Sequence, residues 1–136
     1  MSRARPRSSA NRARRERGSA SIELVILLPA LFAVLFLGMQ AALYYHARTV
    51  AIAAAHQGAK AAGAENGTAA DGISAATSFL IDAGGESVLT GASATANRSA
   101  TTVTVTVAGH SLNVIPGWKP AVVQSASLPA ERLTTP

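Results

Sequence analysis

The feature that most constrains this chain is a long run of apolar residues near its start. Residues 24–43 read LVILLPALFAVLFLGMQAAL and contain a single strongly polar side chain, Gln40. A helix of this length rises about 30 Å, which matches the hydrocarbon core of a bilayer. Tyr44 and Tyr45 follow where an interfacial aromatic belt would lie. A chain of 136 residues is too small to bury such a helix on all sides, so we predict a membrane span over residues 24–43.

Most of the positively charged residues lie before this span. The formal net charge is +5, and residues 1–18 hold seven arginines and only one acidic residue. No aromatic residue is interleaved with these arginines, so the tail is not typical of a nucleic-acid surface. The positive-inside rule predicts a single-pass protein with its N-terminus in the cytoplasm and its C-terminal part outside. Composition also predicts that residues 1–18 are a disordered, basic cytoplasmic leader.

The helical pattern continues beyond the span. Residues 46–63 read HARTVAIAAAHQGAKAAG, contain no proline and are dominated by alanine, the best helix former. We therefore predict one long helix over residues 19–63. Small residues recur in it every fourth position, and such rows let helices approach closely, although an alanine-rich helix also produces them by chance. The main row is Ala47, Ala51, Ala55, Ala59 and Gly63, and a second row is Ala54, Gly58 and Ala62.

Residues 64–136 carry the signals of a small α+β domain. Residues 71–83, DGISAATSFLIDA, have the period of a short amphipathic helix that Thr68 or Asp71 can cap. Residues 101–107, TTVTVTV, alternate strictly and predict a half-buried strand.

A partner strand is predicted over residues 121–128, and a third, weaker strand near 87–89 or 93–96. The predicted fold is thus α+β and membrane-anchored. A long N-terminal helix crosses the membrane and extends outside it, and a small extracytoplasmic α+β head contains an antiparallel β pair.

Nothing in the chain has the pattern of a catalytic or metal site. Cysteine is absent, and there are three histidines. His46 and His56 are ten positions apart, about 15 Å along a helix, which is too far for one metal ion. There is no G-x-S-x-G motif and no phosphate-binding loop. We therefore expect no catalytic residues, no metal, no cofactor and no enzymatic activity.

The residues before the span form a recognisable pattern. The arginine tract ends at Gly18, Ser19 begins the next segment, and Glu23 stands at its fifth position. This arrangement resembles the processing site of type IV prepilins and pseudopilins, in which a membrane aspartyl peptidase cuts after the glycine. A glycine lets an extended segment enter a narrow protease cleft. The resemblance implies a cut between Gly18 and Ser19, after which Glu23 pairs with the new N-terminal amine of a neighbouring subunit.

A wider segment, about residues 14–63, resembles the TadE-like family of minor pseudopilins from tight-adherence (Flp, type IVb) pilus systems. The resemblance rests on Glu23, on Leu28-Pro29 within the span, on Arg48 and on AHQGAK at residues 55–60. His56-Gln57 and Lys60 depart from the usual Arg-Glu and Arg, and Leu24 stands where an aromatic residue is usual.

This family resemblance implies a pilus-assembly protein of the cytoplasmic membrane whose N-terminal helix packs among other helices. Its expected partners are the lipid bilayer, a prepilin peptidase, other pilins or pseudopilins, and Tad assembly-platform proteins. Two alternatives remain open. One is an unprocessed, single-span signal-anchored surface protein with a small binding domain. The other is a secreted protein with a signal peptide cut near Ala41, although the apolar run is longer than a typical h-region and Met39 is not the small residue expected there.

Overall fold

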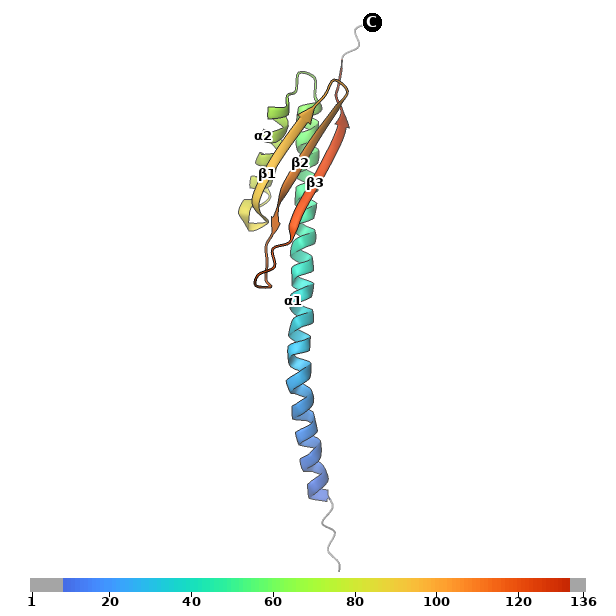
Figure 1. Ribbon diagram of the computed structural model, residues 1–136, viewed down its shortest axis with the longest axis vertical. Coiled ribbons are helices and arrows are strands. Elements are labelled where there is room, and N and C mark those ends of the chain that lie inside the picture. Colours follow the sequence, from blue (N-terminus) through green and yellow to red (C-terminus); the bar gives the residue numbers. More distant parts are fainter. Residues whose placement is uncertain (1–8, 133–136) are drawn as a thin grey trace, which may run out of the picture. The chain divides into compact units, whose positions relative to one another are not determined.

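The computed structural model describes the backbone of residues 9–132 and the side chains from residue 14 onward. The described elements are two α-helices, a short 3-10 helix and a three-stranded sheet (Figure 1). In chain order they are α1 (Ser9–Gly63), α2 (Ala69–Asp82), η1 (Gly85–Ser87), β1 (Leu89–Arg98), β2 (Thr102–Ser111) and β3 (Ala121–Pro129). The predicted α+β class with a long apolar N-terminal helix is confirmed, and the third, weaker strand joins the predicted antiparallel pair in one sheet. The chain divides into two compact units, Met1–Leu37 and Gly38–Pro136.

The first unit contains the N-terminal part of α1. The prediction of disorder over residues 1–18 is wrong for residues 9–18, which are helical, and residues 1–8 lie outside the described part of the chain. Arginine and alanine are good helix formers. Adding residues to an existing helix also avoids the unfavourable nucleation step, so the tract can extend the helix that the apolar run forms. Pro29 lies inside α1 without ending it.

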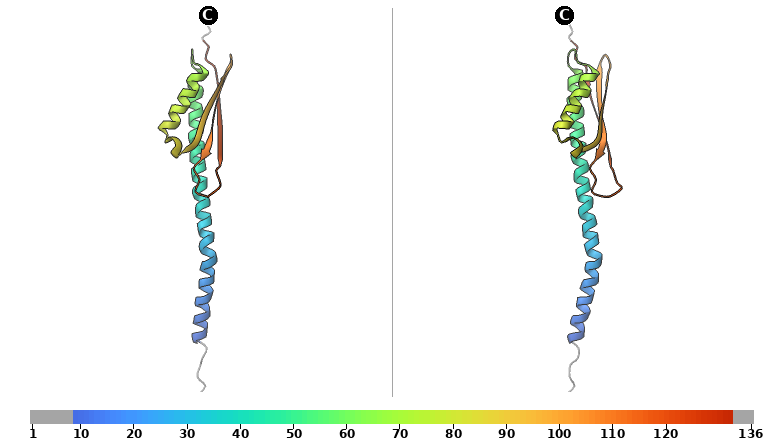
Figure 2. Two further views of the ribbon diagram at one scale, coloured as in Figure 1. Left: turned by 60° about the vertical axis from the view of Figure 1, so that its left-hand side comes forward. Right: turned by 90° about the vertical axis from the view of Figure 1, so that its left-hand side faces the viewer.

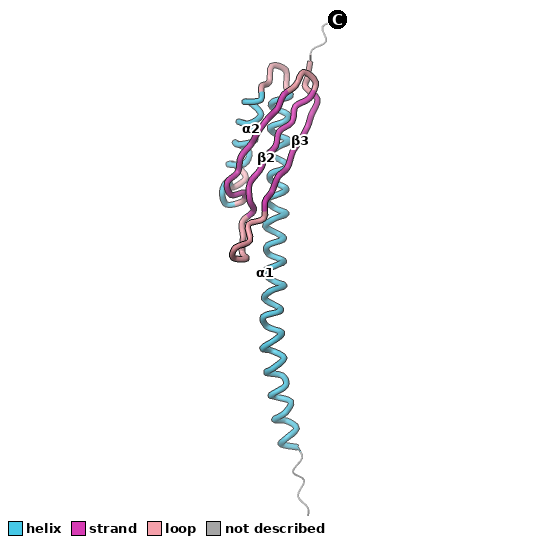
Figure 3. The backbone as a smooth tube through the Cα atoms, in the orientation of Figure 1, coloured by secondary structure: helices cyan, strands magenta, loops and turns pink. Residues whose placement is uncertain are grey.

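The second unit is built on an antiparallel sheet with strand order β1-β2-β3 (Figure 3). The C-terminal part of α1 and the whole of α2 lie on the same face of this sheet (Figure 2). Val105, near the middle of β2, pairs with Ala96 on one side and with Ala126 on the other. The central strand therefore contributes its whole inward face to the core.

The strictly alternating segment behaves as its pattern predicts. Val103, Val105 and Val107 point inward and are completely buried. The threonines between them face the other side of the sheet, where hydroxyl groups of β2 and β3 pair across the strands. These pairs are Thr104 with Ser127 and Thr106 with Ser125, each at 2.8 Å.

Strand β1 is longer than the sequence suggested. It contains the whole of the predicted segment 93–96 but only Leu89 of the alternative segment 87–89. Its pairing with β2 shifts register between Thr90 and Ser93. Gly91 lies in this bulge with φ 59°, a conformation that glycine adopts at no steric cost. The bulge breaks the alternation of side chains, which explains why periodicity alone did not reveal one continuous strand.

The C-terminal end of α1 is closed by contacts from distant segments. The guanidinium group of Arg98, at the end of β1, donates hydrogen bonds to the carbonyls of Ala62 and Ala64. The N–H of Glu131 donates to the carbonyl of Gly63 at 2.8 Å. A cation at this end also interacts favourably with the helix dipole. These bonds satisfy carbonyls that a helix end otherwise leaves without partners.

Helix α2 begins with a capping box in which Thr68, one of the two predicted caps, is the N-cap residue. The Thr68 hydroxyl accepts the N–H of Asp71 at 3.1 Å, and the Asp71 carboxylate accepts the N–H of Thr68 at 2.8 Å. The Thr68 hydroxyl also donates to that carboxylate at 2.8 Å. Hydrogen bonds from the side chain and then the backbone of Thr68 favour the ionised form, so the pKa of Asp71 is lowered.

Candidate functional site

Gly18 lies within α1 in a fully helical backbone. A Cβ atom built on it would meet nothing within 4 Å, so no neighbouring atom requires a glycine here. Glycine inside a helix is about 1 kcal/mol less favourable than alanine. Gly18 therefore weakens this turn of the helix without improving its packing. A role in packing does not explain why a glycine stands here. Gly38 is equally open, but it lies within the apolar run and follows no basic tract.

A second feature weakens the same turn of α1. The hydroxyl of Ser21 donates a hydrogen bond to the carbonyl of Arg17 at 3.0 Å. Such a bond to the residue four positions back competes with the backbone ladder of the helix. The turn between Arg17 and Ser21 therefore combines a glycine with a competing side-chain hydrogen bond, and both lower the free energy needed to unwind it.

Glu23 lies on the surface of α1. Side chains that meet on a helix are three or four positions apart, and those positions around Glu23 are all uncharged. They are Ser19, Ala20, Ile26 and Leu27. The helix itself thus offers this carboxylate no cation on its own face.

The apolar run that follows is exposed throughout. Among the residues that the structure describes, this is the one helix long and apolar enough to cross a membrane, and none of its apolar window is buried. Its large side chains, from Ile22 to Met39, are between 45% and 73% exposed. Phe32 and Phe36 stack on one another one turn apart. A surface of this size with no polar covering can anchor in a membrane.

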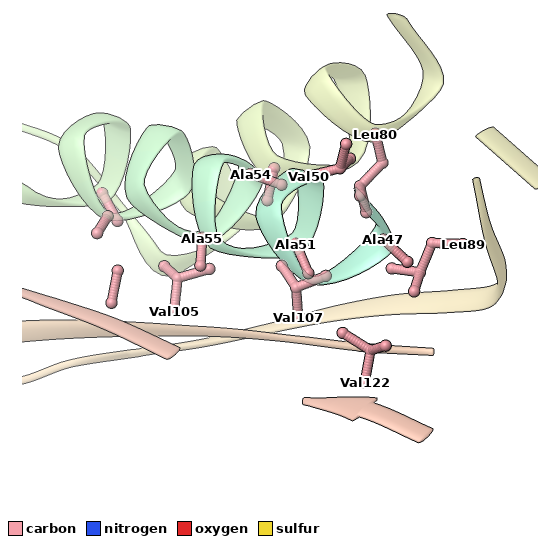
Figure 4. Close-up of a cluster of buried hydrophobic side chains, with 14 of the residues drawn as sticks. Ala47, Val50, Ala51, Ala54, Ala55, Leu80, Leu89, Val105, Val107 and Val122 are labelled. Atoms are coloured by element: carbon pink, nitrogen blue, oxygen red, sulfur yellow. The ribbon is translucent and has the colours of Figure 1, made fainter. Parts of the chain in front are cut away.

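The main row of small residues faces the chain's own sheet. Figure 4 shows Ala51 pointing towards Val107 and Ala55 towards Val105. Four members have no exposed surface at all, namely Ala47, Ala51, Ala55 and Ala59. The fifth, Gly63, is also buried, and a Cβ atom on it would lie 3.4 Å from the carbonyl oxygen of Pro129. The row therefore brings α1 close to the sheet within one chain and leaves these side chains no surface for a neighbouring helix.

The second row receives α2, a contact that sequence reasoning missed. A Cβ atom on Gly58 would lie 2.7 Å from the carbonyl oxygen of Gly72 and 2.9 Å from Val105. A Cβ atom on Gly72 would lie 2.8 Å from that of Ala62. The two helices thus touch backbone to backbone at a pair of glycines. The available signal was a matching small pair in α2, Gly72 and Ala76, four positions apart.

Gln40 is the other residue whose role the sequence did not reveal. It is 1% exposed, and both ends of its amide are engaged by the connection between β2 and β3. Its Nε2 donates to the carbonyl of Leu112 at 3.0 Å, and its Oε1 accepts the N–H of Val114 at 3.0 Å. The single strongly polar residue in the predicted span therefore fastens a segment more than seventy positions away.

Reactive groups in the described part of the chain do not form clusters. His46, His56 and His110 are all exposed, and no group of three His, Cys, Asp or Glu residues there is placed to hold a metal ion. A shallow depression of about 320 Å³ lies between α2 and β1, and Glu86 is the only titratable residue in its lining. The Glu86 carboxylate already accepts the N–H of Gly91 at 3.2 Å. This depression has no partner group for acid–base chemistry.

These features define a class of protein. In its described part the chain has one candidate membrane helix, with a weakened turn before the apolar run, and a small α+β head packed on the C-terminal part of that helix. Residues 18–60 match the family model of TadE-like protein. The resemblance drawn from the sequence is thereby confirmed over this segment, which starts on Gly18 and stops before the sheet. No curated protein and no solved structure matches the chain. The TadE-like family is a structural family associated with tight-adherence (Flp) pilus systems.

Proposed function

We propose that this chain is a minor pseudopilin, or pilus-assembly protein, of a tight-adherence (Flp, type IVb) system. A prepilin peptidase cuts it after Gly18, and Ser19 becomes the N-terminus of the mature chain. The observation that carries the proposal is the combination at Gly18: the family match begins there, and the glycine sits in a helical turn where no packing requires it. Easy unwinding of that turn lets the segment enter a protease cleft in extended form.

The proposed location is the cytoplasmic membrane, with the arginine tract in the cytoplasm and the head outside. The apolar run meets the lipid bilayer, other pilins or pseudopilins and Tad assembly-platform proteins. Glu23 pairs with the Ser19 amine of a neighbouring subunit. This pairing is consistent with the absence of a cation on the helical face around the Glu23 carboxylate.

The secreted alternative is less compatible with the hydrogen bonds of the head. A signal peptidase cut near Ala41 removes Gln40, which holds Leu112 and Val114. It would leave a backbone N–H and a carbonyl of the connection without these partners, and buried groups left unpaired are destabilising. The unprocessed anchor keeps these bonds and therefore remains the main competitor.

N-terminal sequencing of the protein extracted from membranes tests the proposal. A chain that starts at Ser19 supports processing, an intact arginine tract supports the unprocessed anchor, and a start near Ala42 supports a secreted protein. Gly18→Leu should abolish the cut because its side chain hinders entry to the cleft, whereas Gly38→Leu, at the other open helical glycine, should be processed normally. A normally shortened Gly18→Leu product would refute the cleavage site.

A further inference from the structure

The connection between β2 and β3 is unusual for a loop on a small domain. Residues 112–120 include Val114, Ile115 and Trp118, and the tryptophan is 49% exposed. Lys119, directly after it, is also exposed. Leu112, Val114 and Ile115 are half-buried, so Trp118 and the neighbouring cation are the exposed part of this apolar connection. Scattered apolar residues on a surface need no explanation, but a connection with this composition makes an amphipathic tip. Trp and Lys are the residues that favour the boundary between lipid and water, because each joins an apolar body to a polar end.

This tip is an ordered structure. The N–H of Ser111 donates to the carbonyl of Pro120 at 3.0 Å and closes its base. The N–H of Trp118 donates to the carbonyl of Ile115 at 3.3 Å. Gly117, between them, has φ 79°, as the third position of a type II turn after proline requires. The turn therefore fixes the backbone at Trp118, whose side chain is half exposed.

The tip is hydrogen-bonded to α1 at a single residue, Gln40. Gln40 binds Leu112 and Val114, and it directly follows Met39, the last of the exposed large apolar residues of the run. Tyr45 is 62% exposed shortly afterwards on the same helix. From Met39 to Tyr45 a helix rises about 9 Å, and the polar layer on each side of a bilayer is about 5–8 Å thick. The attachment thus lies near the outer end of the predicted span, shortly before Tyr44 and Tyr45.

We propose that this tip is a second membrane contact, with Trp118 seated at the lipid headgroup level and Lys119 directed to lipid phosphates. The inference rests on the proposed anchoring of α1 in a bilayer, but anchoring does not by itself require it. Through this contact the head touches the membrane directly, in addition to its connection through α1. It limits tilting of the head about the end of the span, and it must be released when a subunit leaves the bilayer.

The test uses the intrinsic fluorescence of the full chain reconstituted in phosphatidylcholine–phosphatidylglycerol vesicles. Trp118 is the only tryptophan of the chain, so the wild-type signal reports on this position alone. We expect phosphatidylcholines brominated near the headgroup end of their acyl chains to quench Trp118 more than those brominated deep in the bilayer. Acrylamide, a neutral quencher in water, should act only weakly.

A matched control moves the tryptophan to the opposite end of β2. In the double variant Trp118→Phe with Thr101→Trp, the tryptophan lies in the exposed hairpin between β1 and β2. Its acrylamide quenching should be several-fold stronger than that of wild type, and brominated lipids should have no effect. Lys119→Glu should weaken lipid quenching of Trp118 in anionic vesicles, whereas Lys60→Glu, at the other end of the head, should not.

The possible outcomes separate the two proposals. Trp118 that is open to acrylamide and insensitive to brominated lipid, in a chain that floats with the vesicles, overturns the second contact and leaves the anchor intact. Shielding from both quenchers overturns it too and indicates a protein surface over the tip. A chain that does not float with vesicles overturns the membrane anchor itself, and the second contact with it.

Discussion

Two segments of α1, residues 22–39 and 46–63, are both rich in apolar residues, yet they differ in what covers those residues. Residues 22–39 carry leucine, isoleucine, valine and phenylalanine, and their large side chains remain 45% or more exposed. Residues 46–63 are mainly alanine, and four members of the main small-residue row have no exposed surface. Small side chains let a sheet and a second helix approach the backbone closely, whereas large ones hold other elements of the chain away. Side-chain size and charge both separate the exposed apolar segment of the helix from the segment on which the head packs.

The largest effect should come from placing a large side chain at the glycine crossing. Gly58→Leu drives atoms into the carbonyl of Gly72 and into Val105, and overpacking a filled core is destabilising by about 3 kcal/mol or more in severe cases. We expect a large fall in the melting temperature of the head, measured by circular dichroism in detergent. Gly38→Leu, where a Cβ atom meets nothing, is the control. Equal melting temperatures of the two variants would show that Gly58 does not lie in a close contact with α2 and the sheet.

An intermediate effect is expected where the exposed half ends. Gln40→Ala leaves the Leu112 carbonyl and the Val114 N–H without their partners, a loss of about 1–3 kcal/mol for buried polar groups. Hydrogen exchange at the Val114 amide should accelerate, and the head should melt earlier. Gln57→Ala, on an exposed position of the same helix, should change neither. A Val114 amide that exchanges at the wild-type rate would show that the amide of Gln40 does not hold the connection.

A change in the exposed half should affect assembly while leaving the head unaltered. Glu23→Ala removes a carboxylate whose insertion near the membrane edge is unfavourable by less than about 2.5 kcal/mol, so membrane insertion should be unchanged or slightly easier. Incorporation into filaments, measured by co-purification with partner pilins, should fall because the proposed pairing with the Ser19 amine is lost. Glu65→Ala, in the exposed turn after α1, serves as control. Normal incorporation of Glu23→Ala would exclude the pairing.

The smallest expected effect concerns pH and belongs to the head alone. The pKa of Asp71 is lowered in the folded chain by its hydrogen bonds with Thr68. The capping box therefore contributes its full stability above the pKa of the unfolded chain, and this contribution is lost as the pH falls through the lower folded pKa. The melting-temperature difference between wild type and Asp71→Asn should shrink on acidification. A difference that stays constant across the acid range would show that the ionised form of Asp71 does not support the cap.

Local patterns predicted the elements that rest on local physics. The alternation of valine and threonine indicated β2, the residues after Thr68 indicated α2, and the apolar run indicated the long helix. Strand β1 was only partly foreseen because its bulge at Gly91 interrupts the period on which the prediction depended. Residues 9–18 were misjudged because composition says little about a helix that grows from an adjoining segment.

The candidate processing site was accessible to sequence reasoning because its three residues are adjacent in the chain. Gly18, Ser19 and Glu23 form a pattern whether or not the fold is known, and the family match begins at its first residue.

The order of the residues alone determined the apolar segment, the charge asymmetry around it and the alternation of β2, because each depends on neighbours along the chain. Only the tertiary structure decided what the small-residue rows face. A row of alanines is compatible with a sheet, with a helix of the same chain or with a neighbouring subunit, since any of these can approach so small a surface. Here the sheet occupies one row and Gly72 the other. The partners of Gln40 likewise come from residues far along the chain, and no local pattern specifies a contact over that distance.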